Sequence, residues 1–113
     1  MPAEFAVLAG PNPTDQLAFR CNSLQILWNC TDEPWADDGL HCHTDSVEVF
    51  IVLKGTLHVA VENETVEVGA GEVCIFPTGV FHAITGGKPP IEALVIRAPA
   101  SQDKVTSGKG EVR

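Results

Sequence analysis

Short segments of alternating hydrophobic and polar residues, separated by turn residues, fill most of the chain. Residues 17–30 place Leu24, Ile26 and Trp28 at alternate positions, which predicts a half-buried strand. Further strands are predicted at residues 47–53, 56–61, 65–68, 73–76, 80–84 and 91–98, each ending at Gly, Pro, Asn or charged turn residues. No segment keeps a helical period over three turns. Many short strands at this spacing predict an all-β protein, either a sandwich or a barrel.

The length of the chain limits its domain organisation. At 113 residues it has room for a single domain. We expect the core at about residues 24–98, preceded by an extended, proline-containing strap at residues 1–16. Residues 99–113 are rich in polar residues, glycine and lysine, and we expect a tail there.

The predicted strand at residues 47–53 is apolar on both faces. Val49, Ile51 and Leu53 share one face. Phe50 and Val52 share the other face with Glu48. A strand that is apolar on both faces is covered on both sides, either by a second sheet or by another subunit. This pattern favours a homodimer.

Charge and cysteine content narrow the partners and the compartment. The net charge is −8, from fifteen acidic and seven basic residues, and no basic cluster exists in the sequence. Binding to nucleic acid or to an anionic membrane is therefore not expected. The four cysteines lack Cys-x-x-Cys spacing, and the N-terminal segment does not read as a secretory signal. We expect reduced cysteines and a cytoplasmic protein, with Cys42 and Cys74 as small core residues.

Histidine is the most informative residue type. His41 and His43 lie two apart, so in a strand their side chains share a face, with Cys42 opposite. Glu48 lies five residues after His43, and this odd separation would place it on the opposite face of an unbroken strand. The turn-prone residues 44–46 can break the strand and return Glu48 to the inner face. His82 follows a Pro-x-Gly turn on a different strand. His58 is out of phase with its apolar neighbours, so we expect it to point outward.

These residues stand at spacings that resemble the two motifs of the cupin superfamily. The first motif is formed by His41, His43, Glu48 and Gly55, and the second by Gly71, Pro77, Gly79 and His82. Fifteen residues separate the motifs, similar to the shortest gap in small single-domain cupins. Two positions depart from the family pattern. Trp35 stands where the first motif usually opens with Gly, and Gly86 stands where the second often ends with Asn.

The resemblance implies a cupin barrel, a double-stranded β-helix of two antiparallel sheets with a metal ion near its open end. It implies His41, His43, Glu48 and His82 as ligands, with water or substrate at the remaining positions. Three nitrogen donors and one oxygen donor suit divalent Fe, Mn, Ni, Co, Cu or Zn, and affinity alone does not select among them. We expect Phe50, Val52 and Ile84 to line or pack the barrel, and together with Arg97 they are the candidate residues of a substrate pocket. Arg97 either anchors a substrate carboxylate or forms a salt bridge at an edge.

The function we expect is that of a metal-dependent enzyme acting on a small oxygen-rich molecule, of dioxygenase, isomerase, decarboxylase or lyase type. The alternative is a non-catalytic cupin that uses the same metal to bind or sense a small molecule. A purely structural barrel is disfavoured because all four ligands are present. The sequence contains no Tyr and no acid or base that can be assigned beyond the ligands, so it does not separate enzyme from binder.

Overall fold

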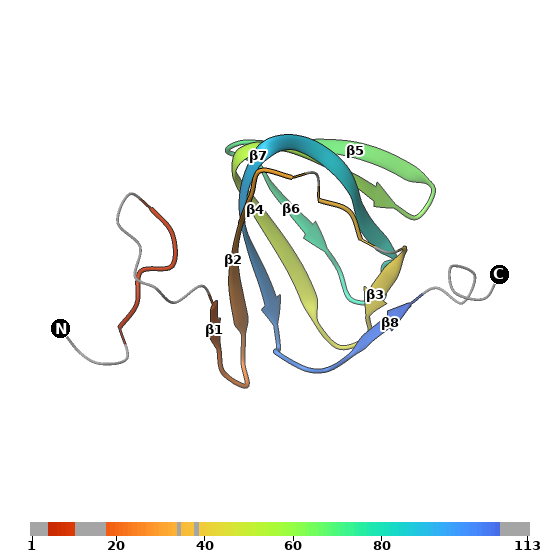
Figure 1. Ribbon diagram of the computed structural model, residues 1–113. Helices are drawn as coiled ribbons and strands as arrows, with labels where there is room; N and C mark the ends of the chain where they lie inside the picture. Colours follow the sequence, from red (N-terminus) through yellow and green to blue (C-terminus); the bar gives the residue numbers. More distant parts are fainter. Residues whose placement is uncertain (1–4, 11–17, 34, 38, 107–113) are drawn as a thin grey trace.

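Strands account for all the regular secondary structure in the described part of the chain. The computed structural model describes residues 5–10, 18–33, 35–37 and 39–106 (Figure 1). Its strands are β1 (Ala18–Arg20), β2 (Gln25–Thr31), β3 (His41–His43), β4 (Val47–Val61), β5 (Glu64–Gly69), β6 (Val73–Phe76), β7 (His82–Ala98) and β8 (Lys104–Thr106). All strand pairs are antiparallel. The predicted all-β class is confirmed.

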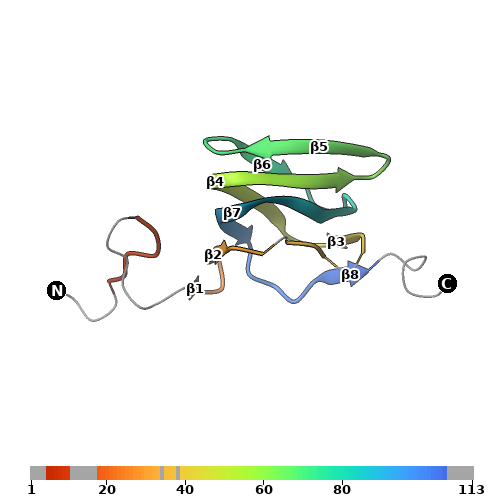
Figure 2. The same cartoon turned by 45° about the horizontal axis from the view of Figure 1, so that its top comes forward.

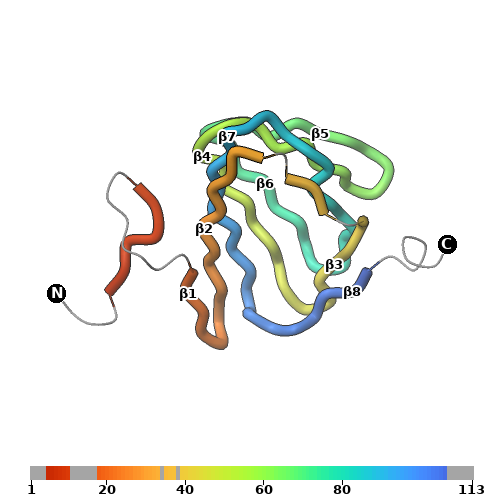
Figure 3. Tube along the Cα trace, viewed as in Figure 1, coloured from red at the N-terminus to blue at the C-terminus, as the bar shows by residue number. Residues whose placement is uncertain are grey.

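Two long strands, β4 and β7, take part in both layers of the barrel. In one layer the first half of β4 lies between β6 and the second half of β7, which continues into β2 and β1. In the other layer the second half of β4 lies between β5 and the first half of β7, followed by β3 and β8 (Figure 2). The tube in Figure 3 shows both long strands bending from one layer into the other. This is the expected double-stranded β-helix.

The continuity of β4 corrects the expectation that its strand ends at Gly55. Pairing with β7 continues from Val47 to Val61, with register shifts between Val52 and Lys54 and between Lys54 and Thr56. Gly55 has a φ of 78°, and a side chain there would collide with backbone oxygens of β7. The glycine therefore bends the strand between layers without ending it.

The same correction applies to β7, which was expected as two strands separated by residues 85–90. Lys88, Gly87 and Gly86 remain paired with the second half of β4, so the segment stays in the sheet despite its glycines and prolines. The strand also begins at His82 rather than at residue 80.

The hydrophobic core fills the space between the two layers. It consists of Phe50, Val52, Leu57, Val59, Val68, Phe76, Ile84 and Ile91. Trp35, at the position where the family motif has Gly, packs against this core with its ring 5.8 Å from that of Phe50. His58 lies between two inward residues and is half-exposed, with Nε2 3.2 Å from a carboxylate oxygen of Glu67. Its expected outward orientation is confirmed.

The two ends of the chain differ from each other. Most of the predicted N-terminal strap, residues 1–4 and 11–16, lies outside the described residues, and residues 5–10 form no strand and lie apart from the barrel in Figure 1. The expectation of a tail after residue 98 is wrong for β8, which pairs with β3 through Val105 opposite Cys42. This pairing satisfies the backbone groups along an edge of β3 that would otherwise be unpaired.

All four cysteines are free thiols. Cys42 is buried, and Cys74 is half-buried against the hydrophobic core, where burial raises the pKa of its thiol.

Within the described residues, no helix has the length and apolar character needed to cross a membrane.

Candidate metal centre

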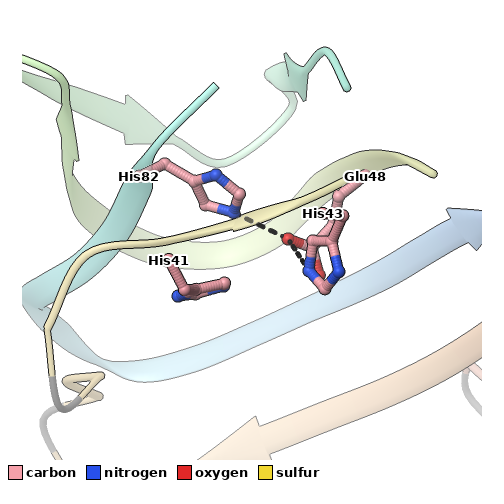
Figure 4. A group of neighbouring side chains, drawn as sticks. All are labelled: His41, His43, Glu48 and His82. Carbon is pink, nitrogen blue, oxygen red and sulfur yellow. Dashed lines mark hydrogen bonds and ion pairs between the residues drawn. The ribbon is translucent and has the colours of Figure 1, made fainter. Parts of the chain in front are cut away.

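Three strands bring together four buried side chains at one end of the barrel. His41 and His43 come from β3, His82 from the start of β7, and Glu48 from the start of β4 (Figure 4). Each residue offers one ligand atom, and these atoms all lie within 4.8 Å of one another. The imidazoles belong to one layer and the carboxylate to the other, so the closed barrel assembles the group.

The turn between β3 and β4 directs Glu48 into the barrel. Ser46 is fully buried there, and its Oγ lies 2.9 Å from the Pro99 carbonyl oxygen and 2.7 Å from Oδ2 of Asp103. The Thr78 hydroxyl donates a hydrogen bond to the Ser46 carbonyl oxygen. These contacts hold the break between the two strands, which the odd separation of Glu48 from His43 requires if both side chains are to face inward.

Two of the imidazoles have their Nδ1 atoms bound to acceptors. Nδ1 of His82 lies 3.0 Å from the Val80 carbonyl oxygen, and Nδ1 of His43 lies 3.0 Å from Oδ1 of Asp103. Because a carbonyl and a carboxylate only accept, Nδ1 carries the proton in each ring. In the neutral form, each ring then directs the lone pair of Nε2 inward.

The inward nitrogen atoms converge on a single carboxylate oxygen. Oε1 of Glu48 lies 2.8 Å from Nε2 of His82 and 3.5 Å from Nε2 of His43. Two imidazole lone pairs facing a carboxylate repel it unless a proton or a metal cation lies between them. Ligand atoms that are each about 2.0–2.2 Å from one metal ion lie roughly 3 Å apart, which agrees with these separations. The residues present therefore fit a metal ion, and the cluster could hold one.

Neighbouring groups set the charge of this cluster. Burial, the nearby His82 and the positive charge of Lys104 lower the pKa of His41. Burial works to raise the pKa of Glu48, but a hydrogen bond from the protonated form of His82 and the positive charge of the neighbouring imidazoles when protonated outweigh burial and lower it. The cluster thus presents a carboxylate together with a His41 ring that favours its neutral form, as metal ligation requires.

The sequence matches the cupin domain family, Cupin_2, over residues 28–97, more than half of the chain and including all four residues of the cluster. The protein belongs to the cupin family. A search of curated proteins finds no match.

Solved structures with similar folds include other cupins. A cupin-2 domain protein from Shewanella frigidimarina is 29% identical, with a TM-score of 0.58 over 71% of this chain and 74% of that one. Streptomyces Pac13 with uridine is 19% identical, with a TM-score of 0.65 over 77% of this chain and 69% of that one. The DMSP lyase DddQ from Ruegeria pomeroyi is 20% identical, with a TM-score of 0.67 over 96% of this chain and 52% of that one. The latter two similarities concern the fold alone.

Asp103 is a residue of the cupin site that sequence reasoning missed. Its Oδ1 contacts His43, while Oδ2 lies close to the Ser46 hydroxyl and accepts from the Asp45 backbone N–H at 2.8 Å. Burial works to raise the pKa of Asp103, but these hydrogen bonds lower it well below its usual range. The ionised carboxylate fixes the ring of His43. Asp103 lies 60 residues from His43 in a polar segment, so no local pattern marks it.

The predicted substrate-pocket residues lie in two environments. Phe50, Val52 and Ile84 belong to the hydrophobic core, and the latter two are essentially fully enclosed. Arg97 is half-buried and lines a cavity of about 320 Å³. Their contact with a substrate remains a prediction.

Proposed function

We propose that this cupin is a metal-dependent enzyme that acts on a small oxygen-rich molecule. One divalent transition-metal ion would be held by His41, His43, Glu48 and His82. The observation that carries this proposal is the convergence of two imidazole lone pairs on one carboxylate oxygen inside a buried cluster. A cation among these atoms satisfies all of them at once.

A metal ion bound here would supply Lewis acidity to an oxygen-bearing ligand. The chain itself holds the ligand atoms in place. Asp103 and the Val80 carbonyl orient two of the imidazoles, and the ring of Phe76 stacks on His82 with a centroid distance of 3.9 Å. Because Phe76 belongs to the hydrophobic core, the apolar core closes one side of the cluster. Dioxygenase, isomerase, decarboxylase and lyase chemistry are all compatible with this arrangement.

Related folds support a small-molecule substrate. Pac13 is a nucleoside dehydratase and DddQ is a DMSP lyase, so this barrel serves enzymes that act on small molecules. Both proteins are too distant from this chain to lend it their substrates.

A non-catalytic, metal-dependent binding protein is the second candidate. One observation favours it. Asp103 is the carboxylate in direct contact with the cluster among the described residues, and both of its oxygens are already engaged. The carboxylate that touches the cluster is therefore not free to act as an acid or base.

The test is the metal content of the purified protein, followed by oxygen uptake with a panel of diols, 1,3-dicarbonyls and thiols. Substrate-dependent uptake by iron-loaded protein would identify a dioxygenase. Product formation without oxygen uptake would identify an isomerase, decarboxylase or lyase. Ligand binding without product would favour the binding protein, and failure to take up any first-row metal would overturn both functions.

We further propose that the outer face of β4 and β6 packs against a second copy of the chain. Val73 and Ile75 on β6 are 56% and 60% exposed, and they lie opposite the half-buried Ile51 and Val49. The second layer covers the inner face of β4, whereas no part of the chain that the structure describes covers this outer apolar face. Light scattering should give the mass of a dimer, and Ile75→Glu should shift it toward the monomer.

A further inference from the structure

A cavity beside the candidate metal centre gathers positive charge on an acidic protein. It measures about 320 Å³, and its lining includes Arg20, Arg97, Lys104 and Asp103. The whole chain carries a net charge of −8. Three of the five basic residues in the described segments nevertheless line this one cavity. Such a concentration of like charge calls for a reason, because neighbouring cations repel.

Within the described segments, these three cations have no carboxylate partner in an ion pair. Among the described residues, the ion pair that a lysine or arginine forms with a carboxylate is that of Lys54 with Glu92, at 3.9 Å. It lies on a different part of the barrel. Arg20 instead donates to the Ala100 carbonyl oxygen at 3.2 Å, which leaves its charge uncompensated. The positive charge of the cavity is thus not neutralised by ion pairs among the described residues.

Arg97 is the best placed of the three for a ligand near the metal centre. It lies directly opposite Glu48 on β4 and opposite Gln25 on β2. Residues opposite each other in an antiparallel pair share a face, so Arg97 lies on the inner face beside a proposed metal ligand. One Nη atom donates to the Gln25 amide oxygen at 3.0 Å, and the buried Nε has no hydrogen-bond partner among the described residues.

The cavity and the metal centre share a wall. Asp103 lines the cavity and also contacts His43, while Lys104 lies opposite His43 in the β3–β8 pair. The negative charge of Asp103 offsets part of the cavity's charge, but one carboxylate against three cations leaves the lining with a net positive charge. An anion in the cavity would therefore meet three cations beside the carboxylate that contacts His43.

We propose that this cavity binds an anionic oxygen group, a carboxylate or a phosphate, of the molecule whose other oxygen atoms reach the metal centre. The proposal rests on the proposed function and adds the charge class of its ligand. The planar fork of Arg97 suits both groups, since each accepts two parallel N–H donors. The unpartnered Nε–H is one of the donors that such a group would satisfy.

The test uses succinate, 2-phosphoglycolate and neutral succinamide as probes. Binding is measured by calorimetry, and the Arg97 Nε–H resonance is followed by ¹⁵N NMR, for metal-free and zinc-loaded protein. The anionic probes should bind and shift this resonance, whereas succinamide should do neither. Arg97→Met should weaken anion binding at least about tenfold, as expected for a charge-assisted pair. Lys88→Met removes an exposed charge on β7 away from the cavity and should leave binding unchanged.

The outcomes separate the two proposals. Protein that binds zinc but binds succinate no better than succinamide would overturn the anion site and leave the proposed function standing. Protein that binds succinate through Arg97 but takes up no metal would keep the anion site and overturn the proposed function. 2-Phosphoglycolate replaces one carboxylate of succinate with a phosphate, so tighter binding of 2-phosphoglycolate would identify the phosphate, and equal or weaker binding the carboxylate. If Arg97→Met does not fold, the wild-type resonance shift and the exposed Lys104→Met variant decide the question.

Discussion

The two ends of the barrel interior are organised by different forces. At one end, Leu57, Val59 and Ile84 are buried with 1% exposure or less, and the transfer of apolar surface from water holds the layers together. At the other end, buried imidazoles and carboxylates are fixed by directional hydrogen bonds. Apolar burial stabilises the first end without any bound ion, whereas the ligand atoms of the second end all have a partner only when a cation is bound. Stability and function can therefore be perturbed separately.

The largest expected effect is at the polar end. His41→Ala removes one of four proposed ligands, so metal affinity should fall by orders of magnitude while the metal-free protein keeps its fold. Competition with a metal-binding dye measures the affinity, and circular dichroism monitors the fold. His58→Ala, which removes a half-exposed imidazole from the outer face, is the matched control and should bind metal normally. Equal losses in the two variants would contradict the assigned site.

The apolar end should respond in the opposite way. Leu57 is fully buried, and Leu57→Ala should lower the free energy of unfolding by about 2–5 kcal/mol through lost burial and a residual cavity. Urea denaturation of the metal-free protein measures this loss. The fraction that remains folded should still bind metal with nearly wild-type affinity. A large loss of affinity in that fraction would show that the two ends are not independent.

The same contrast explains what the sequence predicted. Alternation in residues 56–61 was sufficient to place Leu57 and Val59 inside and His58 outside, because burial in a strand follows a period of two. The family spacings were sufficient to bring His41 and Glu48 together. The contribution of Asp103 depends on the pairing of β8 with β3, a long-range contact that no local pattern encodes. The bend at Gly55 was misread as a strand end because bulges and turns use the same residue.

A smaller effect is expected from the residue that the sequence did not reveal. Asp103→Asn removes the carboxylate that orients His43, and such a change typically weakens metal affinity about 10- to 100-fold. Asp32→Asn removes an exposed carboxylate and should change affinity little. Calorimetric titration with zinc measures both variants. An Asp103→Asn protein with wild-type affinity would mean that the ring of His43 needs no such support.

The smallest effect is expected at Cys42, which lies between two proposed ligands in β3. Its side chain is buried but does not belong to the metal cluster. Cys42→Ser should leave the metal stoichiometry unchanged and should lower stability only modestly, since a small buried side chain is replaced by one of similar size. Metal analysis and thermal melting measure the two effects. Loss of metal from this variant would reverse the assigned faces of β3.

X-ray absorption spectroscopy of zinc-loaded protein tests the metal centre most directly. With His41, His43, Glu48 and His82 as ligands, the first shell contains only nitrogen and oxygen, at about 2.0–2.2 Å, with imidazole scattering beyond it. The account predicts this spectrum at one zinc per chain. A sulfur scatterer at about 2.3 Å would place a cysteine on the metal and contradict the account.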